Sequence, residues 1–171
     1  MNVKRLWAPW RVHYITAIGK KTKGCVFCSI RRQKKDRKNL IFIRRRLAYG
    51  VLNIYPYNNG HCLIIPNRHV NDLRKLSAAE KAELYGLVEE TQDLLDRTIH
   101  PEGYNIGINC GRVAGAGFPG HIHIHIVPRW RGDVNFMPVT GQTKVISQSL
   151  EALYDLLIKD VRAQKTYEKK N

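Results

Sequence analysis

Three histidines in strict alternation constrain this chain more than any other feature. They occupy alternate positions in the run His121-Ile-His-Ile-His-Ile-Val127. Alternate side chains of a β-strand point to the same face. The run therefore predicts a strand with His121, His123 and His125 on one face and three isoleucines on the other. Because imidazole is neutral near pH 7 and can act as nucleophile, acid, base or metal ligand, the alternation predicts a chemical site.

The positive charge of the chain is concentrated near its N-terminus. The 171 residues carry a net charge of +15. Residues 1–46 hold fifteen Lys and Arg with one acidic residue, whereas residues 47–171 hold fourteen and thirteen. Such an excess attracts phosphates, nucleic acid or anionic surfaces, or it is a basic surface without a specific partner. The run Arg31–Lys38 contains no aromatic residue for base stacking, so single-strand nucleic-acid binding is weakly supported.

Length and composition indicate one domain with extensions. Hydrophobic residues make up 43% of the chain, enough for a normal core. No apolar run approaches the roughly 20 residues of a membrane span, and Pro9, Arg11 and His13 interrupt any signal-peptide core. Four cysteines fit a reducing compartment better than a disulfide framework. We therefore expect a cytoplasmic protein without a membrane segment.

The hydrophobic periodicity predicts an α+β fold, an antiparallel sheet with one long and one C-terminal helix. The long helix begins with a capping box formed by Ser77 and Glu80. The expected strands are 47–54, 61–65, 103–110 and 121–127, with a turn at 55–60, a glycine-rich loop at 111–120, and helices at 77–97 and 147–165. We expect a basic arm at 1–24, a core at 25–135, and an extension at 136–171 whose amphipathic helix packs on the same domain.

The pair Cys25-Val-Phe-Cys28 is the second chemical signal. This spacing suits either zinc or a redox pair, and no βαβ unit surrounds it, as a thioredoxin-type motif requires. A structural Cys2His2 zinc site is the favoured interpretation, with His61, His69 and His121 as available partners. The other two cysteines, Cys62 and Cys110, lie in apolar runs and are predicted to be small core residues.

The segment from Asn53 to His69, Asn-Ile-Tyr-Pro-Tyr-Asn-Asn-Gly-His-Cys-Leu-Ile-Ile-Pro-Asn-Arg-His, completes a recognisable pattern. Together with the cysteine pair and the alternating histidines, it resembles the histidine triad family of nucleotide hydrolases and transferases. The segments Leu6–Arg11, Gly107–Gly117 and Val127–Met137 are similar to the bacterial diadenosine tetraphosphate phosphorylase branch of that family. The glutamine that helps position the leaving group in the hydrolase branch is missing, because Ala116 follows Ala114 and Gly115 here.

The resemblance implies a role for each histidine. His123 is the expected nucleophile on the α-phosphorus, and His125 is expected to contact the phosphate and its developing charge. His61 is expected to support the triad by hydrogen bonding. His121 joins Cys25, Cys28 and His69 around a structural Zn²⁺.

The resemblance also implies the substrate contacts. Asn53 is expected to meet the ribose, although a turn residue at a strand end is the other interpretation. Asn109 and the loop Gly111–Gly117, including Gly115 and Gly117, are expected to line the phosphate path. The loop, the missing glutamine and the flanking residues Arg112, Arg129 and Arg131 favour inorganic phosphate as the acceptor, with solvated surface charge as the alternative for each arginine.

The implied reaction is nucleotidyl transfer on dinucleoside polyphosphates, foremost phosphorolysis of diadenosine tetraphosphate to ATP and ADP. A hydrolase of dinucleoside polyphosphates or nucleoside phosphoramidates is the alternative. Two other classes stay open: a zinc hydrolase whose three triad histidines all bind metal, and a nucleic-acid-binding protein that uses the basic arm. The family also implies a homodimer or tetramer, paired through the helix at 77–97 and through sheet edges.

Overall fold

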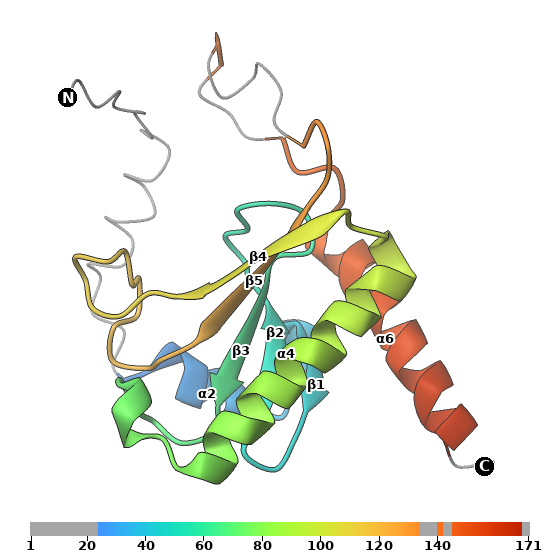
Figure 1. The fold of residues 1–171 in the computed structure, drawn as a ribbon. Coiled ribbons are helices and arrows are strands. Elements are labelled where there is room, and N and C mark those ends of the chain that lie inside the picture. The colour runs from blue at the N-terminus through green and yellow to red at the C-terminus, as the bar shows by residue number, and fades with distance from the viewer. Residues whose placement is uncertain (1–23, 134–139, 142–144, 169–171) are drawn as a thin grey trace.

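A five-stranded antiparallel sheet with strand order β1-β2-β3-β5-β4 organises the molecule (Figure 1). The computed structural model describes residues 24–133, 140–141 and 145–168. The elements are α2 Val26–Gln33, α3 Asp36–Asn39, β1 Ile41–Arg44, β2 Ala48–Leu52, β3 Cys62–Pro66, the short 3-10 helix η1 Leu73–Lys75, α4 Ala78–Ile99, β4 Gly103–Ile108, β5 Ile124–Arg129 and α6 Leu150–Glu168. The α+β prediction is confirmed.

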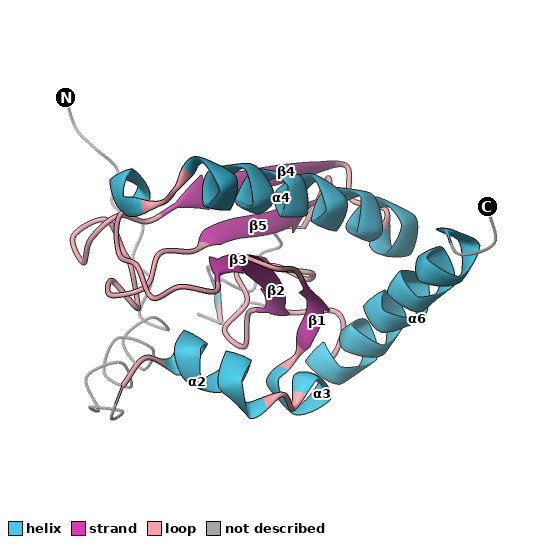
Figure 2. Cartoon of the chain, turned by 90° about the horizontal axis from the view of Figure 1, so that it is seen from below, coloured by secondary structure: helices cyan, strands magenta, loops and turns pink. Residues whose placement is uncertain are grey.

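Helices α4 and α2 lie on opposite faces of the sheet (Figure 2). The register of β3 and β5 divides their side chains between these faces: Ile64 is opposite Ile124, and Leu63 is opposite His125. The buried isoleucines therefore belong to the core, and His125 shares its face with Leu63. On that second face the Tyr49 hydroxyl of β2 donates to the Phe27 carbonyl of α2 at 2.9 Å. The histidine face of the sheet is thus the face that α2 covers.

Helix α4 forms where its periodicity predicts. Ser77 and Glu80 make the expected capping box: the Ser77 backbone N–H donates to the Glu80 carboxylate at 2.8 Å, and Glu80 N–H donates to the Ser77 hydroxyl at 3.2 Å. This pair satisfies donors that helix geometry leaves unpaired at the N-terminus. The apolar stripe is buried at Leu84, Leu87, Val88, Leu94 and Leu95.

Helix α6 begins three residues later than the sequence predicts. The Ser149 hydroxyl accepts from the Ala152 backbone N–H at 3.2 Å, and this cap sets the start at Leu150. Its stripe then buries Leu153 and Leu157 against α4 and β1. An ion pair between Arg97 of α4 and Asp160 of α6 joins the two helices at 2.7 Å. The helix thus packs on the sheet domain, while the domain boundaries stay predictions.

The histidine strand is shorter than expected. Strand β5 begins at Ile124, so His121 and His123 lie in an extended segment just before it. The Ile122 N–H donates to the Val70 carbonyl at 2.7 Å rather than to a sheet neighbour, because β3 has already ended at Pro66, which has no N–H to continue the ladder. The alternation of side chains nevertheless continues through the segment.

Two further expectations were wrong or incomplete. Cys62 is buried, but Cys110 is exposed, because β4 ends at Ile108 and Cys110 lies in the irregular segment that follows. The elements α2, α3 and β1, which place residues 26–44 on the sheet domain, were not predicted from the sequence. Residues 1–23 and 134–139 lie outside the described residues. Within the described part of the chain, no helix has the length and apolar character to cross a membrane.

We expect Glu80→Gln to lower the free energy of unfolding at pH 7 by about 1–2 kcal/mol, because it weakens both the cap and a charge-assisted pair. The Arg68 guanidinium, together with the Ser77 N–H, lowers the pKa of Glu80 from 4.5 to about 2. The stabilisation is therefore full above pH 4.5 and is lost as the pH falls towards 2. Urea unfolding at pH 7 and pH 3 measures the free energy of unfolding of the variant and the unmodified protein. Glu89→Gln, at an exposed position on the same helix, is the control. An equal effect of Glu80→Gln at both pH values contradicts this account.

Candidate functional site

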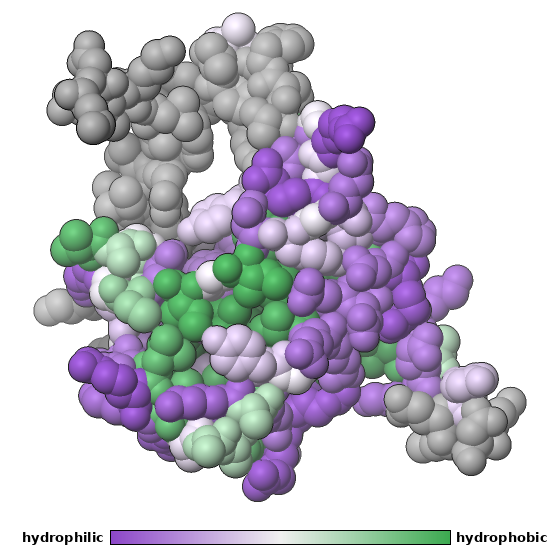
Figure 3. All heavy atoms as spheres, viewed as in Figure 1, coloured by the Kyte–Doolittle hydropathy of each residue, from purple (hydrophilic) through white to green (hydrophobic). Residues whose placement is uncertain are grey.

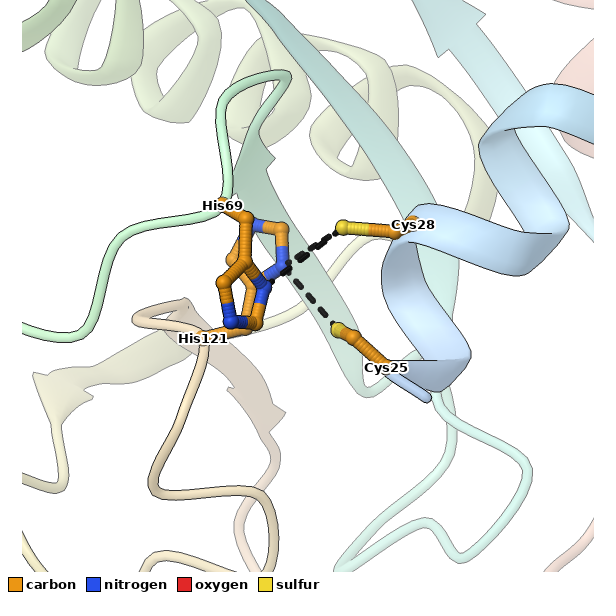
Figure 4. Close-up of side chains that lie close together, drawn as sticks. All are labelled: Cys25, Cys28, His69 and His121. Atoms are coloured by element: carbon orange, nitrogen blue, oxygen red, sulfur yellow. Dashed lines mark hydrogen bonds between the residues drawn. The ribbon is translucent and has the colours of Figure 1, made fainter. Parts of the chain in front are cut away.

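Two cysteines and two histidines from three separate segments form a compact cluster (Figure 4). Cys25 is the N-cap of α2 and Cys28 lies in its first turn, whereas His69 follows β3 and His121 precedes β5. Their ligand atoms all lie within 4.8 Å of one another. The Cys25 Sγ is 3.2 Å from His121 Nδ1, and the Cys28 Sγ is 3.5 Å from His69 Nδ1.

This geometry fits a tetrahedral metal ion. Zinc at about 2.3 Å from sulfur and about 2.1 Å from nitrogen places those ligand atoms about 3.6 Å apart. His121 donates its Nε2–H to the Pro66 carbonyl at 3.0 Å, which leaves Nδ1 unprotonated towards the cysteines. Burial also lowers the pKa of His121 to about 4, so the ring is neutral at pH 7. The donor set and the tautomer are both those that a Cys2His2 site requires.

The segment that carries His69 is tied to α4. The guanidinium of its neighbour Arg68 donates to both Glu80 carboxylate oxygens, at 2.9 and 2.8 Å, and to the Lys75 carbonyl at 2.7 Å. A bidentate arginine–carboxylate pair fixes the relative orientation of the two side chains and is stronger than a single hydrogen bond. Glu80, the acidic residue of the α4 capping box, therefore also helps to position His69 of the cluster.

His123 and His125 line a separate cavity of about 250 Å³ between the sheet and α2. Its apolar wall is formed by Val26, Phe27, Ile30, Val51, Leu52, Ile54, Leu63 and Phe118, and its polar residues include Lys38, Asn39 and Asn53. The Phe27 and His123 rings lie 5.0 Å apart between centroids. A concave, mostly apolar site with a few convergent polar groups is typical of small-molecule binding.

His123 presents one nitrogen to this cavity in an unprotonated form. Its Nδ1 lies 2.9 Å from the His121 carbonyl oxygen, which can only accept, so Nδ1 carries the proton. The neutral tautomer then has a lone pair on Nε2. Burial lowers the pKa of His123, which keeps the ring neutral near pH 7. An imidazole in this form can act as a nucleophile without a separate base.

A chain of hydrogen bonds assigns the tautomer of His125. The Tyr57 backbone N–H donates to His61 Nδ1 at 3.0 Å, so His61 carries its proton on Nε2. That Nε2 lies 2.9 Å from His125 Nδ1 and donates to it. Burial, followed by the charge of His123, lowers the pKa of His125 to about 4. Neutral His125 must then carry its proton on Nε2.

The His125 Nε2–H has no hydrogen-bond partner in the part of the chain that the structure describes. It is one of two buried side-chain polar atoms, among the residues that the structure describes, that lack a hydrogen bond. A buried donor without an acceptor is costly, and this one belongs to a residue that lines the cavity. An oxygen acceptor on a bound ligand would satisfy it.

Comparison with known proteins agrees with this geometry. Residues 34–132 match the HIT domain family. The chain belongs to the histidine triad family. It is 37% identical over 163 residues to a protein named AP-4-A phosphorylase from Mycobacterium tuberculosis (strain ATCC 25618 / H37Rv). The matched region covers 91% of this chain and 83% of that protein.

Two further histidine triad relatives bear on the site. The asymmetrical bis(5'-nucleosyl)-tetraphosphatase of Schizosaccharomyces pombe (strain 972 / ATCC 24843) is 36% identical over 93 residues, 54% of this chain and 50% of that protein. The crystal structure of a Zn-bound histidine triad family protein from Mycobacterium smegmatis matches with a TM-score of 0.67 at 26% identity. That match covers 84% of this chain and 97% of the other.

The predicted substrate residues of the histidine triad site fall into two groups. Asn53 lines the cavity, but its side chain also accepts from the Tyr55 N–H at 3.0 Å and contacts His61 Nδ1 at 3.3 Å, so it is a turn residue as well. Asn109 donates to the Gly115 carbonyl at 3.5 Å. Asn109, Gly115 and Gly117 do not line the 250 Å³ cavity. The substrate roles of all four residues, Asn53 included, stay predictions.

The predicted arginines also differ from one another. Arg129 is held by both carboxylate oxygens of Asp133, at 2.6 and 3.0 Å, and by the Asn105 side chain at 2.7 Å. This guanidinium is therefore engaged within the protein rather than with a ligand. Arg112 is exposed in the glycine-rich loop and has no ion-pair partner among the described residues, and it stays the better candidate for an acceptor phosphate.

Sequence reasoning missed the support of the turn at residues 55–60. Asp133 accepts from the buried Asn58 side chain at 2.7 Å, and Asn58 also donates to the Pro128 carbonyl at 3.0 Å. Gly60 closes the turn at φ +74°, where a Cβ would lie 2.6 Å from Ile99. These contacts hold the Tyr57 N–H that sets the His61 tautomer. The sequence shows Asn58 and Asp133, but it does not show that these two residues, 75 positions apart, form a hydrogen bond.

Proposed function

We propose that this protein transfers a nucleotidyl group from dinucleoside polyphosphates to inorganic phosphate through a nucleotidyl-His123 intermediate. With diadenosine tetraphosphate the products are ATP and ADP. The observation that carries the proposal is the pairing of two tautomers in one cavity: an unprotonated Nε2 on His123 and an unpartnered Nε2–H on His125. The similarity to the mycobacterial AP-4-A phosphorylase supports the same reaction.

The first half-reaction uses both rings. His123 Nε2 attacks the α-phosphorus, a P–N bond forms, and the P–O bond to the departing polyphosphate breaks, releasing ATP from diadenosine tetraphosphate. Negative charge increases on the phosphate oxygens as the leaving group departs. We expect the His125 Nε2–H to donate to one of these oxygens, because a donor that is already oriented in a buried site stabilises such charge strongly.

The second half-reaction returns the ring to its neutral form. An oxygen of inorganic phosphate attacks the same phosphorus, the P–N bond breaks, and ADP is released. Water in place of phosphate gives AMP. Because no step needs a proton to be removed from His123 before attack, orientation of the imidazole matters more than a general base. Asn53 is proposed to meet the ribose, and Asn109, Gly115 and Gly117 are proposed to lie along the phosphate path.

Hydrolysis of dinucleoside polyphosphates or nucleoside phosphoramidates is the second candidate function. The fission-yeast tetraphosphatase relative supports it, and the same two histidines would serve it. A zinc hydrolase with all three triad histidines on the metal receives no support. Among the described residues, the metal-ligand cluster contains His121 but neither His123 nor His125.

The four-residue cluster is proposed to hold a structural Zn²⁺. The donor distances, the tautomer of His121 and the Zn-bound relative support this. All four residues are protein ligands, and a closed set of this kind is typical of structural rather than catalytic zinc. When bound, the ion would supply folding energy and hold α2 to the segment before β5. The thiols that it needs favour a reducing compartment, in keeping with a cytoplasmic protein.

A homodimer, or a tetramer built from dimers, is also proposed. Strand β4 is an edge of the sheet, and its Ile106 is 44% exposed. Figure 3 shows apolar surface at the centre of the face that is turned towards the viewer, over β4 and α4, with hydrophilic residues around it. An unpaired edge with apolar side chains favours pairing with another chain. Nucleic-acid binding by the basic N-terminal arm stays a weakly supported alternative, because the basic run Arg31–Lys38 has no aromatic residue for base stacking. Residues 1–23 lie outside the described residues.

We expect His123→Gly to lower turnover of diadenosine tetraphosphate by more than about a thousandfold, because a covalent nucleophile is removed. Added imidazole should restore part of the rate by occupying the vacated space. His100→Asn is the matched control: His100 is exposed, and asparagine tolerates its φ of 47°. Retention of more than a tenth of the activity by His123→Gly would sink the nucleophile assignment.

Inorganic phosphate at millimolar concentration should accelerate loss of diadenosine tetraphosphate and change the second product from AMP to ADP. Product identification by chromatography, with and without phosphate, measures this. Arg112→Gln should raise the KM for phosphate several-fold, because the guanidinium N–H donors of that residue are lost. Arg162→Gln, at an exposed position on α6, should leave this KM unchanged. AMP as the product at every phosphate concentration rejects the phosphorylase and favours the hydrolase.

Purified protein should contain about one zinc ion per chain, as four ligands imply. Cys28→Ala should lose most of the metal and lower the melting temperature, because metal binding and folding are coupled. Cys110→Ala is the matched control, since this cysteine is exposed and outside the cluster. Elemental analysis that finds no metal, or full retention of zinc by Cys28→Ala, rejects the site.

Light scattering at micromolar concentration should report a dimer or a higher even-numbered oligomer. Ile106→Lys should shift the protein towards monomer, because a charge on an edge strand opposes pairing. Val145→Lys, at a residue that is 53% exposed but outside the sheet, should leave the mass unchanged. A monomer for the unmodified protein ends the proposal.

A further inference from the structure

A second, polar cavity of about 510 Å³, shallow and open to solvent, lies on the outer side of the cysteine–histidine cluster. It is lined by Cys25, Cys28, Arg31, Arg32, Asn67 and Arg68, together with His69. It shares no lining residue with the cavity of His123 and His125. The two cavities therefore offer separate sites to a ligand.

Helix α2 divides its residues between these two cavities. Phe27 and Ile30 line the apolar cavity, whereas Cys28, Arg31 and Arg32 line the polar one. Residues three and four apart share one face of a helix, so the spacing from Cys28 to the two arginines places all three together. The last turn of α2 thus presents two guanidinium groups to the outer cavity.

These two arginines lack acidic partners among the described residues. Arg32 uses only its Nε, which donates to the Cys28 carbonyl at 3.2 Å. The Arg31 Nε is buried and has no hydrogen-bond partner. The third arginine, Arg68, is already paired with Glu80 at 2.8 Å. Among the described residues, the cavity is therefore lined by two guanidinium groups without an acidic partner, and the Arg31 Nε–H has no acceptor.

Neighbouring groups do not remove this charge. Asp36, the acidic residue that follows α2, is paired with Arg44 at 2.6 Å. A Zn²⁺ with two thiolates and two neutral imidazoles has no net charge, so a filled cluster leaves the arginines unpaired. The Asn67 amide is also engaged, since it donates to the Arg46 carbonyl at 2.8 Å and to the Arg45 carbonyl at 3.2 Å. An anion is the missing partner.

We propose that Arg31 and Arg32 form a binding site for a phosphate group, in the cavity outside the cysteine–histidine cluster. The planar fork of arginine donors matches phosphate oxygens, and both guanidinium groups line this cavity without an acidic partner among the described residues. The phosphate group comes either from free inorganic phosphate or from the backbone of a nucleic acid. The site lacks an exposed aromatic residue for base stacking among its lining residues, so base identity plays no part.

The arginine side-chain Nε–H resonances of the ¹⁵N-labelled, unmodified protein test this directly. Titration with sodium phosphate, at an ionic strength matched with sodium chloride, should move the Arg31 and Arg32 signals saturably. The Arg162 signal should not move. A second titration uses a duplex RNA of about 20 base pairs, whose backbone presents the same groups in a row. Saturation by inorganic phosphate alone identifies the free ion as the source. Tighter binding of the duplex at equal phosphate concentration identifies the nucleic-acid backbone.

The double variant Arg31→Gln, Arg32→Gln provides the second measurement. Its affinity for whichever titrant binds should fall at least about tenfold, because two charge-assisted contacts are lost. Arg162→Gln should bind as the unmodified protein does, and zinc content serves as the check that the cluster is intact. If neither titrant moves the Arg31 and Arg32 signals saturably, or if the double variant binds with unchanged affinity, the site does not exist. This result is independent of turnover at His123.

Discussion

The extended segment from His121 to His125 is the constraint on which the rest of this structure depends. Its alternating side chains connect two sites that lie on the same face of the sheet. His121 enters the cysteine–histidine cluster, and His123 and His125 enter the cavity that α2 covers. Any group that holds His121 therefore also holds the backbone carbonyl that orients His123, since that carbonyl accepts from His123 Nδ1 at 2.9 Å.

The second consequence of this arrangement is a pair of complementary tautomers. The backbone of the 55–60 turn sets the proton position on His61, and His61 sets it on His125. A carbonyl sets it independently on His123. One ring then offers a lone pair and its neighbour offers a proton, with ring centroids 4.8 Å apart. Burial keeps both rings neutral by lowering their pKa values. These are the two groups that the proposed reaction requires, a nucleophile and a donor to the phosphate oxygens, and the same residue type supplies both.

Local sequence rules account for the parts of the fold whose causes are local. The capping box at Ser77 and the apolar stripe of α4 were predicted with nearly correct bounds, because both depend on residues three or four apart. The division of His125 and Ile124 between faces followed from the strand period. The three missed elements between residues 26 and 44 are short, and the segment is rich in cations. Strand β1 is ordered by antiparallel pairing with β2, and α3 contacts β1, so neither depends on a periodicity of its own.

The site divides in the same way. The four cluster residues were predicted from a family resemblance, and the structure brings them together. The Asp133–Asn58 contact spans 75 residues, and the Arg129–Asp133 pair becomes visible only when the turn after β5 is seen. Cys110 was placed in the core because an apolar run does not reveal where a strand ends. A distant contact, the geometry of a turn and the end of a strand, rather than residue type, decided these cases.

The most direct test of the central claim is to trap the proposed intermediate on His123. The protein is mixed with diadenosine tetraphosphate without phosphate, quenched in alkali, where a P–N bond to imidazole survives, and digested for mass spectrometry. The account predicts an added adenylyl group on the peptide that contains His123 and its absence when phosphate is added before the quench. An adenylyl group on another residue, or continuous turnover with no adduct at any time point, would contradict it.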